Sequence, residues 1–288
     1  MAIRKLLLPL MGTEAGEAAL LVALMAARQW RAHVAAVHVR HDGREVMQIA
    51  GEGVSGALIE QMMVATEREA MQRAEALRAM FLKVVVAQGI AVASARPDAA
   101  TPSADFAILT GRDEDVVAQA ARVADCTVLA RPDRAEDVTT SDALHAVLFD
   151  SGRPVLICPR VAPARLATRI CLAWSGAAEA AAAARYGLPW MKAASHVTVL
   201  THPAYTRRGP DVEALAAYLA LHGINVDAAR FDRGDAAIGP ALLAAARDHG
   251  ADMLIMGAYS SSRLRQLILG GTTRHVLEHA DLPVLMCR

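Results

Sequence analysis

The chain has 288 residues, of which 54% are hydrophobic and 4% aromatic. This composition supplies apolar cores for two ordinary domains and excludes a disordered chain. The 30 basic and 30 acidic residues cancel, so no basic face favours nucleic acid as a partner. We find no charge-free apolar run of membrane-spanning length, and the run at residues 6–12 is not followed by a secretory cleavage site. We therefore expect a cytoplasmic protein with no membrane partner.

The first half begins with a strand-like run at residues 4–12, an Ala-rich helical stretch at 14–30 and an apolar run at 33–39. Residues 57–86 then show helical periodicity with many Glu, Gln and Arg side chains. They fit either an extended helical arm or one long crossover helix. Both alternatives remain open from the sequence.

The second half repeats this order. A strand-like run at 169–176 leads into an Ala-rich helix at 177–194. Later, Ala251-Asp-Met-Leu-Ile-Met-Gly-Ala258 resembles Ala124-Asp-Cys-Thr-Val-Leu-Ala-Arg131, and Pro283-Val-Leu-Met-Cys287 resembles Pro154-Val-Leu-Ile-Cys158. Recurrence of these blocks in one order indicates an internal duplication.

Apolar strands alternate with amphipathic helices in this second copy. The expected strands are 170–174, 197–201, 225–231, 253–257 and 283–287, and the expected helices are 177–194, 211–222, 236–249 and 272–279. Short apolar strands joined by helical crossovers predict an α/β fold with a parallel sheet covered on both faces. We expect two tandem copies of a five-stranded, Rossmann-like module, as domains 1–162 and 163–288.

The residue types that suit ligand binding are concentrated in the loop from Gly257 to Thr273, between a buried strand and a helix. Ligands of open α/β sheets bind at such carboxyl ends of strands. The glycines permit close approach of the backbone to a ligand, and the helix N-terminus favours an anion. Ser, Thr and Arg side chains add donors, although the loop is not a Walker A motif. The alternative is a Gly-rich connection whose hydroxyls only cap the helix.

The spacing from Gly257 through Ser260 to Gly270 resembles the ATP-binding signature of the universal stress protein family, Gly-x2-Gly-x9-Gly-Ser/Thr. The flanking Gly-Ala-Tyr, Ser-Arg-Leu-Arg, Leu-Gly-Gly and Pro-Val-Leu pieces are similar to tandem, two-domain bacterial members. The resemblance implies an adenine nucleotide alpha hydrolase-like fold, a role in stress response or signalling, and ATP with Mg²⁺ in the second domain. Carried over by position, the nucleotide-binding residues are Ala173, Trp174, Ser175, Leu200, Thr201, Met256, Gly257, Ser260, Gly270, Gly271, Thr272 and Thr273.

Three positions depart from the family pattern. Ser260 stands at the second glycine, Gly271 stands at the Ser/Thr position, and Ser175 replaces a frequent acidic residue. These departures motivate an alternative function, a non-nucleotide-binding interaction or scaffold protein of the same fold.

The equivalent loop of the first copy has lost its binding chemistry. No glycine remains between Ala130 and Ser151, and the acidic side chains in that stretch repel a polyphosphate. The acidic residues concerned are Asp133, Glu136, Asp137 and Asp142. We expect no nucleotide in the first domain.

The remaining candidate groups favour a binding protein over an enzyme. His275 and His279 have a spacing that suits zinc, but a solvated helix end is favoured and no third ligand is identifiable. The cysteines lack a CxxC pair, which favours buried, reduced thiols. No nucleophile–base pair is recognisable, so we expect no catalytic residues and at most slow ATP hydrolysis.

The resemblance also implies how the two copies assemble. Single-domain members often dimerise through their last strand, so residues 154–158 and 283–287 are expected to pair within one chain as a pseudo-dimer. Whether the whole chain also forms a homodimer stays open.

Overall fold

The computed structural model describes residues 2–40, 56–96, 100–131, 138–203, 209–232, 237–259 and 271–288, and of 56–62 and 138–141 the backbone alone. The first half contains β1 (Lys5–Pro9), α1 (Glu14–Trp30), β2 (His33–Arg40), α3 (Gly56–Ala87), β3 (Ala91–Val92), β4 (Ser103–Thr110), α4 (Asp113–Ala121), β5 (Cys126–Ala130), α5 (Val138–Ala146), η1 (Val147–Ser151) and β6 (Val155–Cys158). The second half contains β7 (Arg169–Ala173), α6 (Ala178–Ala193), β8 (His196–Thr201), α7 (Val212–Leu221), β9 (Asp227–Arg230), α8 (Ile238–Asp248), β10 (Met253–Gly257), α9 (Gly271–His279) and β11 (Val284–Cys287).

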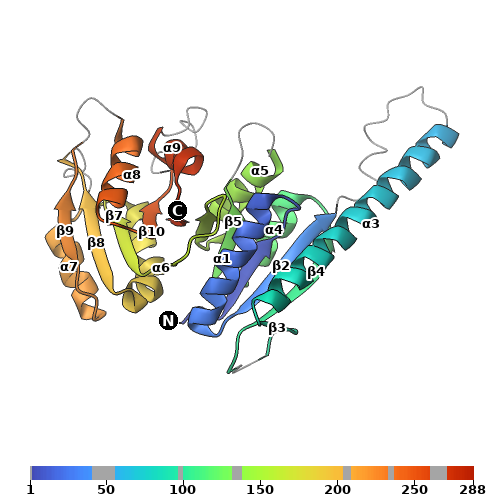
Figure 1. Ribbon diagram of the computed structural model, residues 1–288. Helices are drawn as coiled ribbons and strands as arrows, with labels where there is room; N and C mark the ends of the chain where they lie inside the picture. The colour runs from blue at the N-terminus through green and yellow to red at the C-terminus, as the bar shows by residue number, and fades with distance from the viewer. Residues whose placement is uncertain are drawn as a thin grey trace.

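In the described ranges the strands form one 11-stranded sheet in the order β3-β4-β2-β1-β5-β6-β11-β10-β7-β8-β9 (Figure 1). Every pairing within a half is parallel, as between Leu7 of β1 and Ala35 of β2. The predicted α/β class with a parallel, Rossmann-like sheet is therefore confirmed. The first half carries one strand more than expected, the two-residue β3 at the sheet edge.

Helices cover both faces of the sheet because its strands are apolar on both sides. Leu6 and Leu8 of β1 join a core with α1, α3, α6 and α7, whereas Leu7 joins a core with α4, α5, α8 and α9. A strand directs successive side chains to opposite faces, so a continuous apolar run requires two covering layers. These two layers explain why the sequence shows short uninterrupted apolar runs rather than alternation.

The Ala-rich helix α1 has clear start and stop signals. The Thr13 hydroxyl accepts a hydrogen bond from the Gly16 N–H, and Glu14 and Glu17 lie in the first turn, where the helix dipole favours acidic side chains. The helix ends at Arg31, whose φ of 54° is left-handed. Small Ala side chains on the buried face let the helix backbone approach the sheet closely.

The two halves have the same strand order and meet through their last strands. The order β4-β2-β1-β5-β6 in one corresponds to β9-β8-β7-β10-β11 in the other. Strands β6 and β11 pair antiparallel, with Leu156 opposite Leu285. Beside this junction the rings of Trp30 in α1 and Trp190 in α6 meet edge to face, with centroids 4.3 Å apart. The strands at 154–158 and 283–287 thus lie side by side, as the sequence led us to expect.

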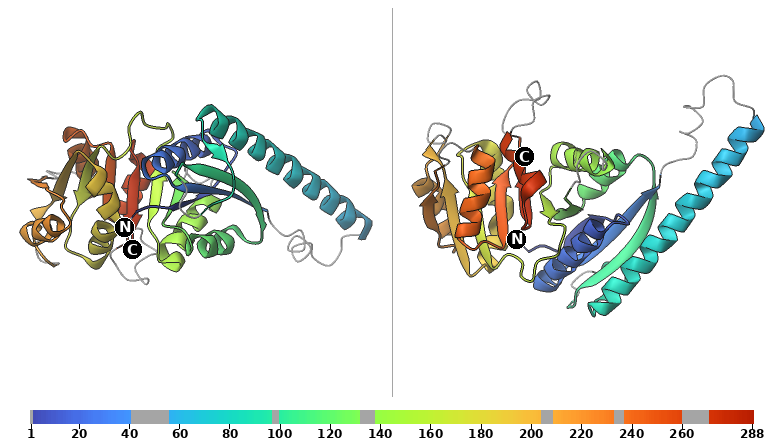
Figure 2. Two further views of the ribbon diagram at one scale, coloured as in Figure 1. Left: turned by 90° about the horizontal axis from the view of Figure 1, so that it is seen from below. Right: turned by 45° about the horizontal axis from the view of Figure 1, so that its top comes forward.

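Helix α3 combines the two alternatives that the sequence left open, an extended helical arm and a long crossover helix. It is one continuous helix of 32 residues, and Leu77, Phe81 and Val85 near its C-terminal end are buried against the sheet. Its N-terminal part extends away from the sheet in the views of Figure 1 and Figure 2, and Val64 and Met71 are exposed there. The segment is both a crossover helix and a projecting arm.

Candidate functional site

A cavity of about 210 Å³ lies at the carboxyl ends of β7 and β10, in the second half of the chain. The starts of helices α6, α8 and α9 close its sides. Its lining residues are Ala173, Ser175, Glu179, Ala180, Ile238, Leu242, Met256, Gly257, Tyr259, Thr272 and Thr273. The position matches the ligand site of open α/β sheets, where strand ends and helix N-termini converge.

Gly257 ends β10 and is required by the packing of α6 rather than by a turn. A Cβ at this position would lie 2.6 Å from the carbonyl carbon of Glu179 and 2.7 Å from the nitrogen of Ala180. Both neighbours are backbone atoms of the first turn of α6, which cannot move without shifting the helix. The missing side chain therefore lets α6 begin directly beside the end of β10 and forms one wall of the cavity.

Tyr259 contributes a wall that the sequence did not reveal. Its φ is 55°, a left-handed conformation that is uncommon outside glycine, and its side chain is buried. The phenolic oxygen lies 3.0 Å from Nε2 of His145, a residue of α5 in the first half. The Phe149 ring lies beside it, with centroids 5.6 Å apart. The wall of this cavity is thus held in place by the other half of the chain.

Burial shifts the acid–base properties of this contact in opposite directions. Desolvation raises the pKa of the Tyr259 phenol. Desolvation lowers the pKa of His145, and the charge of Asp142 opposes that effect. Both shifts favour the neutral forms of the two side chains.

The polar groups of the cavity are hydroxyls and one carboxylate. Thr273 is buried and Thr272 is half-buried, and both lie in the first turn of α9, where free N–H groups and the helix dipole favour an anion. The hydroxyl of Ser175 accepts a long hydrogen bond from the Ala177 N–H at 3.5 Å. Glu179 adds a carboxylate from the first turn of α6. An acidic residue shortly after the first strand of this half was the available signal for Glu179.

The structure brings half of the residues carried over from the family pattern together. Lining the cavity are Ala173, Ser175, Met256, Gly257, Thr272 and Thr273. Gly271 begins α9 next to them, with open space around its Cα. Ser260 and Gly270 lie outside the described residues.

Three further members of that set do not line the cavity. The Trp174 side chain is buried, and its Nε1–H donates to the carbonyl oxygen of Pro210 at 2.9 Å. Leu200 is fully buried in the core, and Thr201 is the half-buried last residue of β8. Strand alternation explains Trp174 and Leu200, because their side chains point into the helical layers rather than to the end of the sheet.

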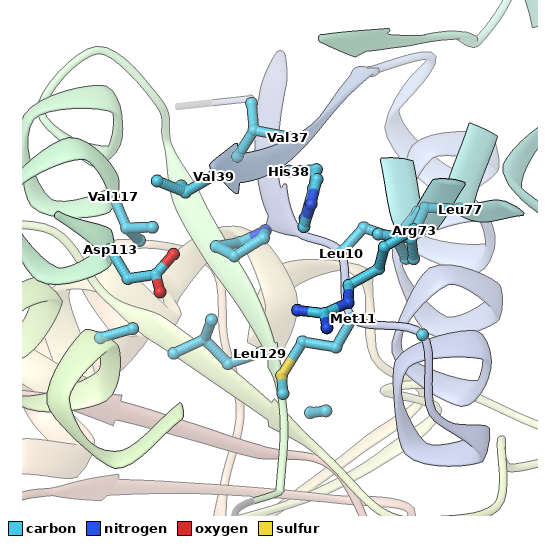
Figure 3. A pocket seen from close by; sticks show the side chains of 14 residues that line it. Leu10, Met11, Val37, His38, Val39, Arg73, Leu77, Asp113, Val117 and Leu129 are labelled. Atoms are coloured by element: carbon cyan, nitrogen blue, oxygen red, sulfur yellow. The ribbon is translucent and has the colours of Figure 1, made fainter. Parts of the chain in front are cut away.

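The first half has a cavity of about 230 Å³ at the corresponding strand ends (Figure 3). It is lined by Pro9, Leu10, Met11, Gly12, Val37, His38, Val39, Arg73, Leu77, Asp113, Val117, Leu129, Ala130 and Ala143. Of the acidic side chains that we expect to repel polyphosphate here, Asp133, Glu136 and Asp137 lie outside the described residues. Asp142 is described and exposed in α5.

The structure also describes the histidine pair and the cysteines that the sequence singled out. His275 and His279 stack with ring centroids 4.1 Å apart, and Nδ1 of His279 lies 3.0 Å from the His275 carbonyl oxygen. Within the described ranges no group of at least three His, Cys, Asp or Glu residues is placed to hold a metal ion.

Cys126, Cys158, Cys171 and Cys287 are buried free thiols, as expected. None of the described helices is long and apolar enough to cross a membrane.

Comparison with known proteins agrees with this architecture. The model of the universal stress protein family matches residues 168–288. The chain is 46% identical over 41 residues to Universal stress protein Slr1230 of Synechocystis, an alignment that spans 14% of either protein. The crystal structure of a universal stress protein from Archaeoglobus fulgidus is similar over 99% of this chain and 98% of its own, with a TM-score of 0.71 and 16% identity.

A putative universal stress protein from Pseudomonas aeruginosa is similar over 99% of this chain and 93% of its own length, with a TM-score of 0.53 and 15% identity. At such identities these structures establish the shared fold. The family match to the second half adds a sequence relationship to it. Residues 168–288 thus match the universal stress protein family, and the whole chain shares its fold with universal stress protein structures.

Proposed function

We propose that the second domain, residues 163–288, binds ATP in the cavity beside Gly257, and that the chain acts by binding rather than by catalysis in stress response or signalling. The observation that carries the proposal is the convergence of Thr272 and Thr273, in the first turn of α9, with Ser175 and Gly257 at two strand ends. This arrangement combines hydroxyl donors, free helix N–H groups and close backbone approach. Residues 1–162 form the partner domain.

The cavity offers separate surroundings for the parts of a nucleotide. Ile238, Leu242 and the ring of Tyr259 give an apolar wall against which a base can pack. Thr272 and Thr273 face the phosphates from the first turn of α9. The Glu179 carboxylate takes the part of the acidic residue that Ser175 replaces.

The oxygen donors also fit a magnesium ion that accompanies the phosphates. Mg²⁺ prefers hard oxygen ligands and is usually held by one or two carboxylates together with substrate phosphates. Glu179 and the Ser175 hydroxyl would be its protein ligands. The ion would neutralise phosphate charge, which matters because Arg274 of α9 is already paired with Glu278 at 2.8 Å.

Calorimetric titration with MgATP tests the proposal. We expect saturable binding of one nucleotide per chain, and the change Thr273→Val should weaken it roughly tenfold by removing a hydroxyl that bonds a charged phosphate. Ser195→Ala is the matched control, because Ser195 bonds the Thr168 carbonyl just before β8, at the opposite end of the sheet. Absence of binding at millimolar MgATP, or equal losses in both variants, would overturn the proposal.

Binding without efficient turnover follows from the composition of the site. Among the described cavity residues, Glu179 is the one acidic side chain, and no His or Lys accompanies it. A hydrolytic site needs a positioned general base together with a group that stabilises the transition state. We propose at most slow ATP hydrolysis. Buried free thiols are compatible with the reducing cytoplasm that we expect.

A second candidate function is favoured by α3. Its projecting part exposes Val64 and Met71, with 64% and 53% of their surfaces accessible. In an interaction or scaffold protein of this fold, such a helix would contact a protein partner and the second-domain cavity would stay without nucleotide. A normal MgATP titration would exclude this candidate as the sole function.

A further inference from the structure

The first-half cavity has different chemistry from its second-half counterpart, although both lie at equivalent strand ends. Its floor is formed by apolar side chains at the ends of β1, β2 and β5, including Leu10, Val39 and Leu129 (Figure 3). Among the described residues that line it, none carries a hydroxyl group. The second-half cavity is lined by four residues that carry hydroxyls, namely Ser175, Tyr259, Thr272 and Thr273. The first-half cavity therefore favours an apolar ligand body over a phosphate chain.

Arg73 brings one positive charge to the rim of this cavity. It belongs to α3, which is much longer than the corresponding helix α7 of the second half, and its guanidinium points toward the cavity next to Met11 (Figure 3). Within the part of the chain that the structure describes, it has neither an ion-pair nor a hydrogen-bond partner. A guanidinium at the edge of an apolar floor is a suitable partner for a carboxylate, which it can bind through two parallel hydrogen bonds.

Asp113 sets a limit on the charge of the ligand. It is the first residue of α4 and lies across the cavity from Arg73 (Figure 3). Its carboxylate disfavours a second negative charge at that side of the cavity. One anionic group at the Arg73 end is therefore compatible with the site, whereas a dianion or a polyphosphate is disfavoured.

From these three features we propose that the first-half cavity binds a small monocarboxylate with an apolar body, such as a medium-chain fatty acid. The carboxylate pairs with Arg73 at the rim, and the hydrocarbon body packs on the Leu and Val side chains of the floor. This ligand site is independent of the nucleotide site proposed for the second half. It gives the first domain a ligand of its own, where the sequence predicts only a degenerate site.

Three probes of one carbon length separate the contributions of charge and apolar body. Octanoate has one carboxylate, 1-octanol has none, and octanedioate has two. In calorimetric titrations of the full chain we expect octanoate to bind saturably, one molecule per chain, and more tightly than either of the other probes. Octanedioate should bind most weakly, because its second carboxylate has to lie on the apolar floor or beside Asp113.

Two variants locate the site. Arg73→Gln should weaken octanoate binding roughly twofold to tenfold, a modest range because Arg73 is exposed, and should leave 1-octanol unchanged. Arg78→Gln, on the same helix but not lining the cavity, is the matched control. Gly12→Val should block all three probes, and it should fold, since a Cβ there meets only the Cδ2 of Leu77 at an ordinary 3.6 Å.

The outcomes are decisive in either direction. Octanoate preference that is lost in Arg73→Gln and retained in Arg78→Gln supports the proposal. Octanoate that fails to saturate, that binds no better than 1-octanol, or that binds equally well to folded Gly12→Val overturns it. A thermal melt of each variant confirms folding, and because MgATP binding reports on the other cavity, its result leaves this test unaffected.

Discussion

The phenolic oxygen of Tyr259 lies 3.0 Å from Nε2 of His145, and this contact links the two cavities through one helix. Tyr259 lines the second-half cavity, while Ala143, on the same helix α5 as His145, lines the first-half cavity. Helix α5 thus contributes one residue to the wall of the first-half cavity and one that supports the wall of the second-half cavity. Because the pKa values of both side chains are shifted, the stability of the junction between the halves should depend on pH.

Acidification should weaken the folded state through His145. Its pKa is lowered in the folded protein, so the contribution of the neutral side chain is present above the ordinary value of 6.5 and is lost as the pH falls through the folded-state value. Urea unfolding between about pH 8 and pH 5 measures this dependence. The difference in unfolding free energy between wild type and His145→Gln should shrink as the pH falls.

The matched control is His222→Gln. His222 is the exposed residue that follows α7, and it packs against Tyr218 with ring centroids 4.9 Å apart. His222→Gln leaves the contact between His145 and Tyr259 intact. A pH-independent effect of His145→Gln would contradict the assignment of this titration to the Tyr259 contact.

Removal of the phenolic hydroxyl isolates the hydrogen bond from the ring packing. Tyr259→Phe keeps the ring against Phe149 and should lower the unfolding free energy by about 0.5–1.5 kcal/mol, the usual net worth of one hydrogen bond. The raised pKa of Tyr259 means that its contribution holds below the ordinary value of 10 and is lost as the pH rises through the folded-state value. In Tyr259→Phe the alkaline loss of stability should be smaller than in wild type.

Gly257 and Gly271 form a matched pair of glycine substitutions. Gly257→Ala places a Cβ 2.6 Å from backbone of Glu179, so it should cost about 1–3 kcal/mol in unfolding free energy and close the second-half cavity. Gly271→Ala has open space within 4 Å at the start of α9 and should be neutral or stabilising by up to about 1 kcal/mol. Chemical denaturation compares the two. Equal effects would contradict the close approach of α6 to β10.

The thiols should be protected from modification in the folded protein. Burial raises the pKa of Cys126 and of Cys171 to about 12, and it raises the pKa of Cys158 and Cys287 as well. Thiolate is the reactive form, so Ellman's reagent in mildly alkaline buffer should react slowly with the native chain and quickly after unfolding in guanidinium. Fast labelling of native protein at one of these cysteines would show that the sheet opens locally around it.

Substitution of Trp30 and Trp190 tests how much the contact between their indole rings stabilises the junction between the halves. Trp190 is fully buried, so Trp190→Ala should cost about 3–5 kcal/mol in unfolding free energy. Trp30 is half-buried, and Trp30→Ala should cost less. A double-mutant cycle should give a coupling of about 0.5–1.5 kcal/mol, the range of an edge-to-face aromatic pair. Additive effects would mean that the rings do not stabilise the junction.

The sequence predicted the elements whose signals are local. The apolar runs around Leu7 and Ile255 and the capped, Ala-rich helix α1 were expected close to where they lie. Strand β9 is shorter than expected, Asp227–Arg230 against residues 225–231, because it lies at the sheet edge with one neighbouring strand. The alternatives for α3 required tertiary contacts to resolve, since periodicity does not say which part of a helix packs.

The candidate site was predicted less completely, for reasons that are also physical. Spacing pointed to Gly257, Thr272 and Thr273, but it suggested a glycine that approaches a ligand, whereas the structure shows one that makes room for α6. Tyr259 was missed because a left-handed φ in a non-glycine residue arises from its contact with a distant helix. Glu179 was missed because the family pattern directs attention to the strand end.

The β6–β11 pairing has a consequence for how the protein behaves at low abundance. Two separate subunits joined in this way would dissociate on dilution and exchange with other subunits that carry a similar last strand. Within one chain the local concentration of each strand around the other is fixed by the short connection between the halves, whatever the amount of protein in the cell. The second-half cavity therefore keeps Tyr259 supported by the same partner, and expression level alone does not change that state.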